Sequence, residues 1–246
     1  MNDIAIIIPV HDYNENIEQM LKRAINSVPT GFDVRISCKN GLSEQFSNLK
    51  EINNVNITIY ENKESEDSSF QTLVNQAVGD SKWFSILEFD DEYTPIWKDN
   101  VTKYINFKPD VSAFFVLEDL FDFNSGEYIG VKNEAPWASS FSNEIGYIDY
   151  ECLDSFFDFY PTGCVFNTED WLEVGGLKPS IELTFWYEFM LRMTNSGKKI
   201  YVIPKVGYNH YVNRENSLFD IYSKTITNEE AEQWFNTAKE KHTSIS

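Results

Sequence analysis

The chain has 246 residues, 42% of them hydrophobic and 15% aromatic, which is enough for a sizeable core, and no apolar run is long enough to span a membrane. Its 39 acidic residues against 20 basic ones give a formal net charge of −19, so we expect no nucleic-acid partner. The first residues lack a basic segment and a cleavage site, and the cysteines at 38, 152 and 164 lack metal-ligand spacing. We therefore expect no signal peptide, reduced thiols and a cytoplasmic protein.

The first 95 residues alternate between strand and helix patterns. Short apolar runs closed by turn residues predict strands, and apolar residues at i, i+3, i+4 and i+7 predict amphipathic helices. The expected strands are 4–10, 32–38, 56–61 and a run that begins at Trp83, and the expected helices are 14–28, 44–52 and 68–78, with Asp12 or Asn14 capping the first. This alternation predicts a parallel sheet with right-handed crossovers.

The second half of the chain is less regular. The patterns predict helices over 97–107, 166–174, 185–195 and 228–241, and strands over 111–119 and 199–203. Residues 126–147 are rich in Gly, Asn and Ser, which favours a long loop with short β pieces. The last helix is expected to begin with Asn228 as its cap and a Glu at the third helical position.

An acidic group follows the strand that begins at Trp83. The stretch reads W-F-S-I-L-E-F-D-D-E-Y-T-P, so four carboxylates, from Glu88 to Glu92, come directly after an apolar run. In an open α/β sheet the ligand crevice lies outside the carboxyl ends of the strands, and Mg²⁺ or Mn²⁺ prefers carboxylate oxygens. The stretch therefore indicates a divalent-cation site, with a solvated acidic turn as the competing interpretation.

Several segments, in order, resemble the family 2 glycosyltransferases of the GT-A fold, over residues 4 to about 217. They read I-A-I-I-I-P-V-H-D-Y-N-E, L-V-N-Q-A-V-G-D-S-K-W-F-S-I-L-E-F-D-D-E-Y-T-P, P-T-G-C-V-F-N-T-E-D-W-L-E-V-G-G-L and F-M-L-R-M-T-N-S-G-K-K-I-Y-V-I-P-K-V-G-Y-N-H. With Asp91 and Pro95 on the family's Asp-to-Pro spacing, Glu88-Phe89-Asp90 falls on its D-x-D motif.

The resemblance implies an α/β protein of the GT-A fold, with a mostly parallel central sheet flanked by helices and a less regular acceptor-side half. We expect one domain over 1–246, made of a nucleotide-binding half (1–95), an acceptor-side half (96–217) and a C-terminal helical extension (218–246). The implied activity is metal-dependent, inverting transfer of a sugar from a nucleotide-diphospho-sugar to a glycan or another hydroxyl acceptor.

The resemblance also implies site residues. Asp90 and His210 would hold Mn²⁺ or Mg²⁺, since carboxylate and imidazole suit these ions. The residues expected at the donor are Pro9, Val10, Asp12, Asn40, Glu88 and Asp90, and those expected at the acceptor are Trp137 and Trp186.

The general base is the first departure from the family pattern. Counting back from Arg192 without a gap places the family's Glu-Asp pair on residues 185–186, which are Phe and Trp and cannot accept a proton. The nearest acids are Glu182, in the preceding loop, and Glu188, two residues on, so we predict the base among these two. For Glu188, pairing with Arg192 at i, i+4 is the alternative role.

The turn after the second strand is the second departure. Lys39 and Asn40 stand where the family has an acidic pair that reads the nucleotide, although the Asn40 amide can still hydrogen-bond a base. The two departures leave open a catalytically degenerate GT-A scaffold that serves as a carbohydrate-binding or structural protein, in a homo-oligomer or a larger assembly. A nucleotidyltransferase is disfavoured, because H-D-Y-N-E-N after the first strand is neither glycine-rich nor basic.

Overall fold

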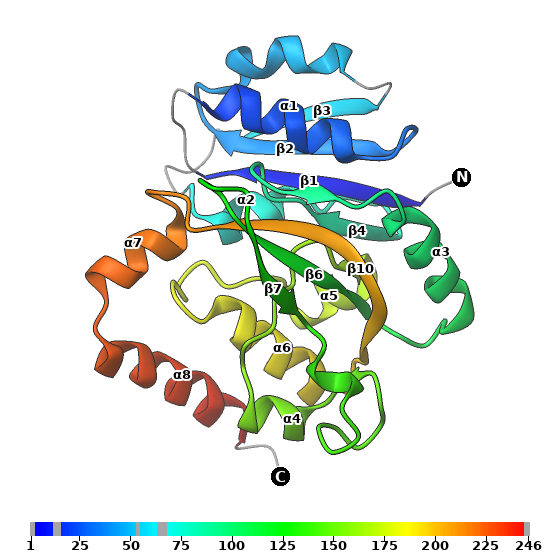
Figure 1. The fold of residues 1–246 in the computed structure, drawn as a ribbon, viewed down its shortest axis with the longest axis vertical. Helices are drawn as coiled ribbons and strands as arrows, with labels where there is room; N and C mark the ends of the chain where they lie inside the picture. The colour runs from blue at the N-terminus through cyan, green and yellow to red at the C-terminus, as the bar shows by residue number, and fades with distance from the viewer. Residues whose placement is uncertain (1–2, 12–15, 53–54, 63–67, 244–246) are drawn as a thin grey trace.

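The computed structural model describes residues 3–11, 16–52, 55–62 and 68–243, built around one sheet (Figure 1). Its strand order is β3-β2-β1-β4-β9-β6-β10-β5, with β7 beside β6 and β8 beside β10. The strands are β1 (Ile4–Val10), β2 (Asp33–Lys39), β3 (Asn56–Asn62), β4 (Trp83–Ile86), β5 (Glu92–Tyr93), β6 (Ala113–Asp122), β7 (Tyr128–Lys132), β8 (Tyr147–Ile148), β9 (Val165–Asn167) and β10 (Ile200–Val212).

The centre of the sheet is parallel, as the sequence predicts. Strand β1 pairs in parallel with β2 on one side and with β4 on the other, and β2 continues the parallel set to β3. Strand β9 lies antiparallel between β4 and β6, and β6 and β10 are parallel to each other. The predicted α/β class with a mostly parallel sheet is thus confirmed, and the sheet contains strands from both halves of the chain.

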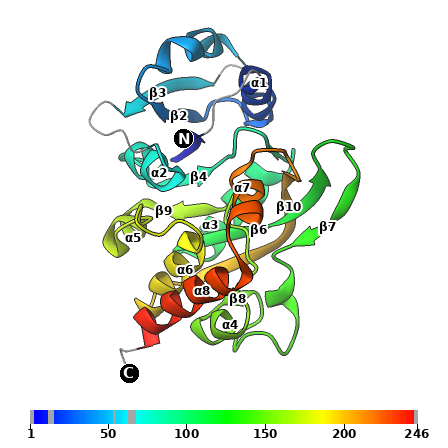
Figure 2. The ribbon, with the colours of Figure 1, turned by 90° about the vertical axis from the view of Figure 1, so that its left-hand side faces the viewer.

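Helices cover both faces of this sheet, so β1 is apolar on both faces. Ile6 and Ile8 pack into the core under α1 and α3, whereas Ala5 and Ile7 pack on the opposite face under α2 and α6. Helix α8 lies beside α6 on that second face (Figure 2). The helices are α1 (Ile17–Ser27), η1 (Ser43–Glu51), α2 (Phe70–Ala77), α3 (Trp97–Phe107), η2 (Ala135–Trp137), α4 (Tyr150–Ser155), α5 (Thr168–Val174), α6 (Phe185–Asn195), α7 (Leu218–Thr225) and α8 (Asn228–Thr243).

Several boundaries differ from the predicted ones. The segment predicted as a helix over 44–52 is the 3₁₀ helix η1, and the strand predicted to end at residue 203 continues to Val212, because β6 runs beside it through Asp122. Both residues proposed as the cap of the first helix, Asp12 and Asn14, lie outside the described residues. Among the helices that the structure describes, none has the length and apolar character of a membrane span.

Side chains cap two of the later helices. Asn167 caps α5, and its side-chain oxygen accepts from the amide of Asp170 at 3.1 Å. Before α8 the capping box is formed by Thr227 and Glu230, not by Asn228: the Thr227 hydroxyl accepts from the Glu230 amide at 3.2 Å, and the Glu230 carboxylate accepts from the Thr227 amide at 2.8 Å.

Candidate functional site

The acidic group predicted at the end of the fourth strand forms a compact cluster. Strand β4 ends at Ile86, and the chain then turns through Glu88, Asp90 and Asp91 into β5, which pairs antiparallel with β10. One carboxylate oxygen from each of these three residues lies within 4.8 Å of the others. The cluster therefore lies at the carboxyl end of β4, where ligands bind in open α/β sheets.

Asp91 is the most deeply buried member of this acidic cluster, with 1% of the residue exposed. Its Oδ1 accepts from the Tyr211 amide at 2.8 Å, whereas its Oδ2 is buried and has no hydrogen-bond partner among the described residues. Burial raises the pKa of Asp91 well above its ordinary value, the charge of His210 lowers it, and the charges of Asp90 and Glu88 raise it further. A buried carboxylate oxygen without a donor can ligate a cation. The sequence placed Asp91 in the acidic group but assigned the metal to Asp90 and His210.

Asp90 has a different partner. Its Oδ2 accepts from Nε of Arg214 at 2.5 Å, and 7% of each side chain is exposed. The Arg214 guanidinium lies 5.0 Å from the centre of the Phe89 ring. Burial and the charge of Asp90 raise the pKa of Glu88 to about 7, against the lowering effect of His210 and Arg214. Arg214 follows β10 in sequence and was not predicted, because nothing near it indicates a partner 124 residues earlier.

His210 lies on β10 and is oriented by Glu118 of β6. Its Nδ1 lies 3.2 Å from Oε2 of Glu118, which is 0% exposed. Burial lowers the pKa of His210, but the charge of Asp91 and the hydrogen bond to Glu118 outweigh it and raise the pKa to about 10. Burial raises the pKa of Glu118 to about 7, although its hydrogen bond to His210 opposes the rise. A carboxylate on one ring nitrogen fixes the orientation of the imidazole, as in many metal sites.

The residues present fit a divalent cation. Four carboxylates (Glu88, Asp90, Asp91 and Glu118) face the guanidinium of Arg214 and the imidazole of His210. With the carboxylates ionised and the imidazole neutral, as a metal ligand must be, three negative charges are in surplus. Carboxylate oxygens with one imidazole form the donor set that Mn²⁺ or Mg²⁺ accepts. The buried Oδ2 of Asp91 and the buried Oε1 of Glu118 both lack a partner among the described residues, which agrees with that surplus.

Those residues predicted at the donor that the structure describes lie at the same edge of the sheet as the acidic cluster. Pro9 and Val10 end β1 and are buried, and Asn40 is exposed directly after β2. Because β1, β2 and β4 are parallel, their carboxyl ends lie next to one another. Asp12, the remaining donor residue, lies outside the described part of the chain.

Trp137 lies away from this edge. Its indole nitrogen donates to the Val202 carbonyl at 3.1 Å, and its ring makes an edge contact with Tyr201, both near the start of β10. Tyr211, which binds Asp91, is ten residues further along β10, so the two ends are roughly 30 Å apart. The structure therefore does not bring Trp137 to the acidic cluster.

Trp186 is part of an aromatic cluster in the core. Its ring stacks on Phe166 with an angle of 9° between the planes and 6.1 Å between the centroids, and Phe70, Trp171 and Phe189 surround it. One face of the indole is thus covered by a core residue. The same cluster extends through Phe70 to His11, directly after β1.

The two candidate bases have different surroundings. Glu188 is 0% exposed, and its carboxylate accepts from Lys178 at 2.6 Å, from Arg192 at 2.8 Å and lies 3.1 Å from Nε2 of His242. Burial raises its pKa, but these three hydrogen bonds outweigh burial and hold the pKa well below its ordinary value. Such a carboxylate is a poor proton acceptor, and the predicted pairing with Arg192 is observed. Glu182 is exposed in the loop before α6, and its carbonyl accepts from the Tyr222 hydroxyl at 3.2 Å.

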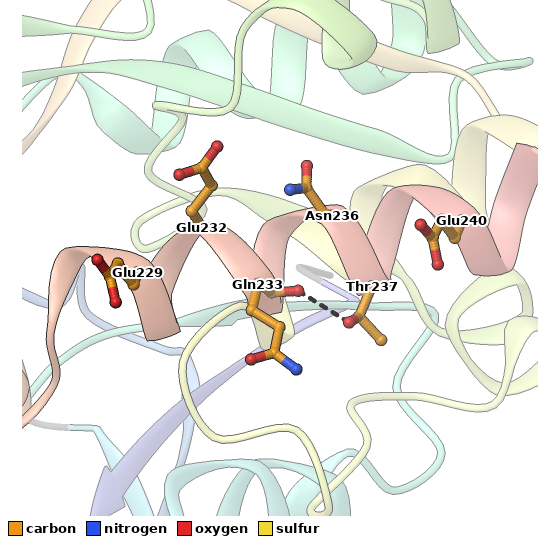
Figure 3. A pocket seen from close by; sticks show the side chains of 6 residues that line it. All are labelled: Glu229, Glu232, Gln233, Asn236, Thr237 and Glu240. Carbon is orange, nitrogen blue, oxygen red and sulfur yellow. Dashed lines mark hydrogen bonds between the residues drawn. The ribbon is translucent and has the colours of Figure 1, made fainter.

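Two surface depressions differ in their relation to the acidic cluster. One, of about 420 Å³, follows the exposed face of α8 (Figure 3), and its lining is Glu229, Glu232, Gln233, Asn236, Thr237 and Glu240. Solvated side chains on a helix need no ligand, so this depression carries no site. The other, of about 510 Å³, is lined by Asn16, Met20, Phe123, Asn124, Arg214, Glu215 and Asn216. Arg214 separates this second depression from Asp90.

No protein-family model matches this sequence, and no curated protein matches it. Solved structures do match the fold. The crystal structure of S. aureus TarS 1-349 in complex with UDP-GlcNAc matches with a TM-score of 0.65 at 12% identity, over 99% of this chain and 73% of that chain. The mannosyltransferase PcManGT from Pyrobaculum calidifontis, in complex with GDP-Man and Mn²⁺, matches with a TM-score of 0.61 at 13% identity, over 87% of this chain and 58% of that chain. At such identity the likeness shows the fold alone, and this is the GT-A fold that the sequence predicted.

Proposed function

We propose that the protein is a metal-dependent, inverting glycosyltransferase that moves a sugar from a nucleotide-diphospho-sugar to a hydroxyl acceptor. The observation that supports it is the cluster of Glu88, Asp90 and Asp91 at the carboxyl end of β4. The charges of Asp91 and Glu88 also raise the pKa of His210. The similar structures were solved with UDP-GlcNAc in one case and with GDP-Man and Mn²⁺ in the other, which supports the same class of donor here.

In this proposal the cation ligands come from Glu88, Asp90 and Asp91, whose oxygens lie within 4.8 Å of one another. His210 lies outside that group of three and is proposed as a further ligand. Mn²⁺ or Mg²⁺, when bound, neutralises the charge of the departing diphosphate. Glu118 holds the imidazole of His210 in one orientation through the hydrogen bond at Nδ1. The ends of β1 and β2, with Pro9, Val10 and Asn40, form the wall against which the nucleotide binds.

The acceptor hydroxyl must lose a proton during transfer, and we propose Glu182 as the general base that accepts it. Inversion requires the acceptor to attack from the side opposite the diphosphate, with a base within hydrogen-bond reach of the hydroxyl. Glu182 is exposed and precedes α6, whereas Glu188 is enclosed by Lys178, Arg192 and His242. A carboxylate whose charged form is stabilised so strongly takes up a proton poorly.

The test is binding of nucleotide and metal to the purified protein. We expect UDP or GDP at millimolar concentration to raise the melting temperature only when Mn²⁺ is present. Asp91→Asn is expected to abolish the shift, because it neutralises the buried carboxylate whose Oδ2 has no donor among the described residues. Asp119→Asn is the matched control, since Asp119 follows Glu118 on β6 and its side chain lies on the other face of the strand. Absence of a shift with every nucleotide in the presence of Mn²⁺ contradicts the proposal.

A second candidate function is a GT-A scaffold without transferase activity, which binds carbohydrate or takes part in an assembly. The observation that favours it is the pair Phe185 and Trp186, which pack with Phe70 in the aromatic cluster at the start of α6 instead of offering carboxylates. A scaffold of this kind keeps its role after Asp90→Ala and forms a defined oligomer in solution. Release of nucleotide diphosphate from a donor sugar, lost in Asp90→Ala, favours the enzyme instead.

A further inference from the structure

The pairing of Asp90 with Arg214 bears on how this site takes a cation. We propose that Arg214 sets the affinity of the site for its divalent cation, because the guanidinium and the cation compete for the carboxylate of Asp90. The inference rests on the proposed function, since it concerns the cation of the same acidic cluster. It adds a residue that neither the sequence motif nor the fold assigns.

The contact between the two side chains is short and enclosed. Nε of Arg214 donates to Oδ2 of Asp90 at 2.5 Å, and the two residues are 6% and 5% exposed. Charge-assisted hydrogen bonds of this kind are among the strongest that side chains form. The Asp90 carbonyl also accepts a hydrogen bond from Arg23, so the residue is held from both its backbone and its side chain. Asp90 is therefore already paired with a positive charge in this structure.

A second positive charge at the same carboxylate meets repulsion. Coulomb repulsion grows as the effective dielectric falls, and the Asp90 carboxylate is almost entirely screened from water. A divalent ion at Glu88, Asp90 and Asp91 would lie within a few ångströms of the guanidinium, since their ligand atoms are within 4.8 Å of one another. The ion therefore binds most tightly when Arg214 has left the carboxylate.

Arg214 has space into which it can move. It lies two residues after Val212, the last residue of β10, so its displacement breaks no strand pairing. It also lines the open depression of about 510 Å³ between the start of α1 and the turn that joins β6 to β7. Movement outward into this depression takes the guanidinium away from Asp90 and from the ring of Phe89.

Direct measurement of Mn²⁺ binding, without nucleotide, tests the inference. We expect Arg214→Gln to bind Mn²⁺ at least tenfold more tightly than the wild type, as measured by electron paramagnetic resonance of free Mn²⁺. Arg214→Lys retains the charge and is expected to stay within threefold of the wild type. Lys22→Gln removes one positive charge at an exposed position of α1 and is the control for net charge, expected to change the affinity less than twofold.

A double variant keeps the test valid if Arg214→Gln alone fails to fold, because it removes both members of the Asp90–Arg214 pair. In an Asp90→Asn background, Arg214→Gln is expected to change Mn²⁺ affinity less than threefold, since the carboxylate for which the guanidinium and the cation compete is absent. Equal or weaker Mn²⁺ binding by folded Arg214→Gln, or a tenfold gain in the Asp90→Asn background, overturns the inference. If Mn²⁺ binds all variants with one affinity, only the role of Arg214 fails. If Mn²⁺ binds neither the wild type nor any variant, the role of Arg214 and the cation dependence of the proposed function both fail.

Discussion

Glu188 decides whether α6 carries a catalytic base or a structural ion-pair cluster, and Glu188→Gln separates the two. The variant keeps the size of the side chain and removes the charge that pairs with Lys178, Arg192 and His242. Because His242 belongs to α8 and Lys178 to the loop before α6, the carboxylate joins three parts of the chain. We expect the variant to lose stability and to keep donor binding.

The magnitude follows from the exposure of each partner. Removing one member of a buried ion pair costs about 3–5 kcal/mol, because the remaining charge is left unpaired. Arg192 is 11% exposed but keeps its hydrogen bonds to the carbonyls of Val174 and Gly176, and Lys178 is 41% exposed and can turn to water. The low end of that range, about 3 kcal/mol, therefore applies. For a chain of this length the loss lowers the melting temperature by roughly 6–12 °C.

The pH dependence has a definite sign. Burial raises the pKa of Glu188, but its hydrogen bonds hold it well below the ordinary value of 4.5, so the carboxylate contributes stability above pH 4.5 and loses that contribution as the pH falls below it. The difference in unfolding free energy between wild type and Glu188→Gln is thus largest near neutral pH and narrows below pH 4.5.

Urea unfolding at pH 7 and pH 4, with thermal melting as a second probe, measures both effects. Glu173→Gln is the matched control, since the Glu173 side chain is 64% exposed and its ion pair with Lys198 is expected to contribute less than about 1 kcal/mol. A Glu188→Gln protein with wild-type stability and no sugar transfer refutes the structural assignment and restores Glu188 as the base.

Three further predictions concern single residues. Glu118→Gln is expected to weaken Mn²⁺ binding by about 10- to 100-fold and to lower the pKa of His210 below about 10, read by NMR titration of the imidazole; an unchanged pKa would show that Glu118 does not orient the ring. Thr227→Ala removes the cap of α8 and should cost about 1 kcal/mol in urea unfolding, whereas the Asn228→Ala control should cost less than about 0.5 kcal/mol. Glu182→Gln should leave nucleotide binding within about twofold and reduce transfer by about 100-fold or more, and full turnover excludes it as the base.

The elements whose bounds were predicted correctly are those with a clear local sequence pattern. Strand β1 and helices α3 and α6 have the predicted bounds, because each is a continuous periodic segment flanked by its own turn residues. Strand β10 was predicted too short, since Pro204 and the polar residues after it are typical of a strand end. The structure accommodates the proline where the register with β6 shifts between Ile203 and Val206. Beyond this shift, β10 continues to pair with β6 as far as Val212.

The site was predictable only where its residues are close in sequence. Glu88 and Asp90 follow a buried run, so their clustering could be inferred from position alone. Glu118 is one acid in an ordinary strand sequence, and its role depends on the register that places β6 beside β10. Arg214 likewise acquires its role from a contact with Asp90, 124 residues earlier in the chain. Long-range pairing of buried charges leaves no local signal. The residues themselves therefore indicated Glu88 and Asp90, the family resemblance supplied His210, and Glu118 and Arg214 were missed.

The buried carboxylates after β4 and the aromatic residues at the start of α6 differ in how they affect the stability of the fold. At the carboxyl end of β4, buried carboxylates outnumber the cations beside them, an arrangement that is unfavourable unless a ligand balances the charge or protons neutralise it, and burial raises the pKa values of Glu88, Asp91 and Glu118. On the acceptor side, Phe185 is 7% exposed and packs with Trp186 against Phe70, so aromatic residues there add to the core. The proposed cation would balance this charge in the ionised state. In the proposed transferase, turnover then requires an acid outside positions 185–186, such as Glu182, to reach the acceptor.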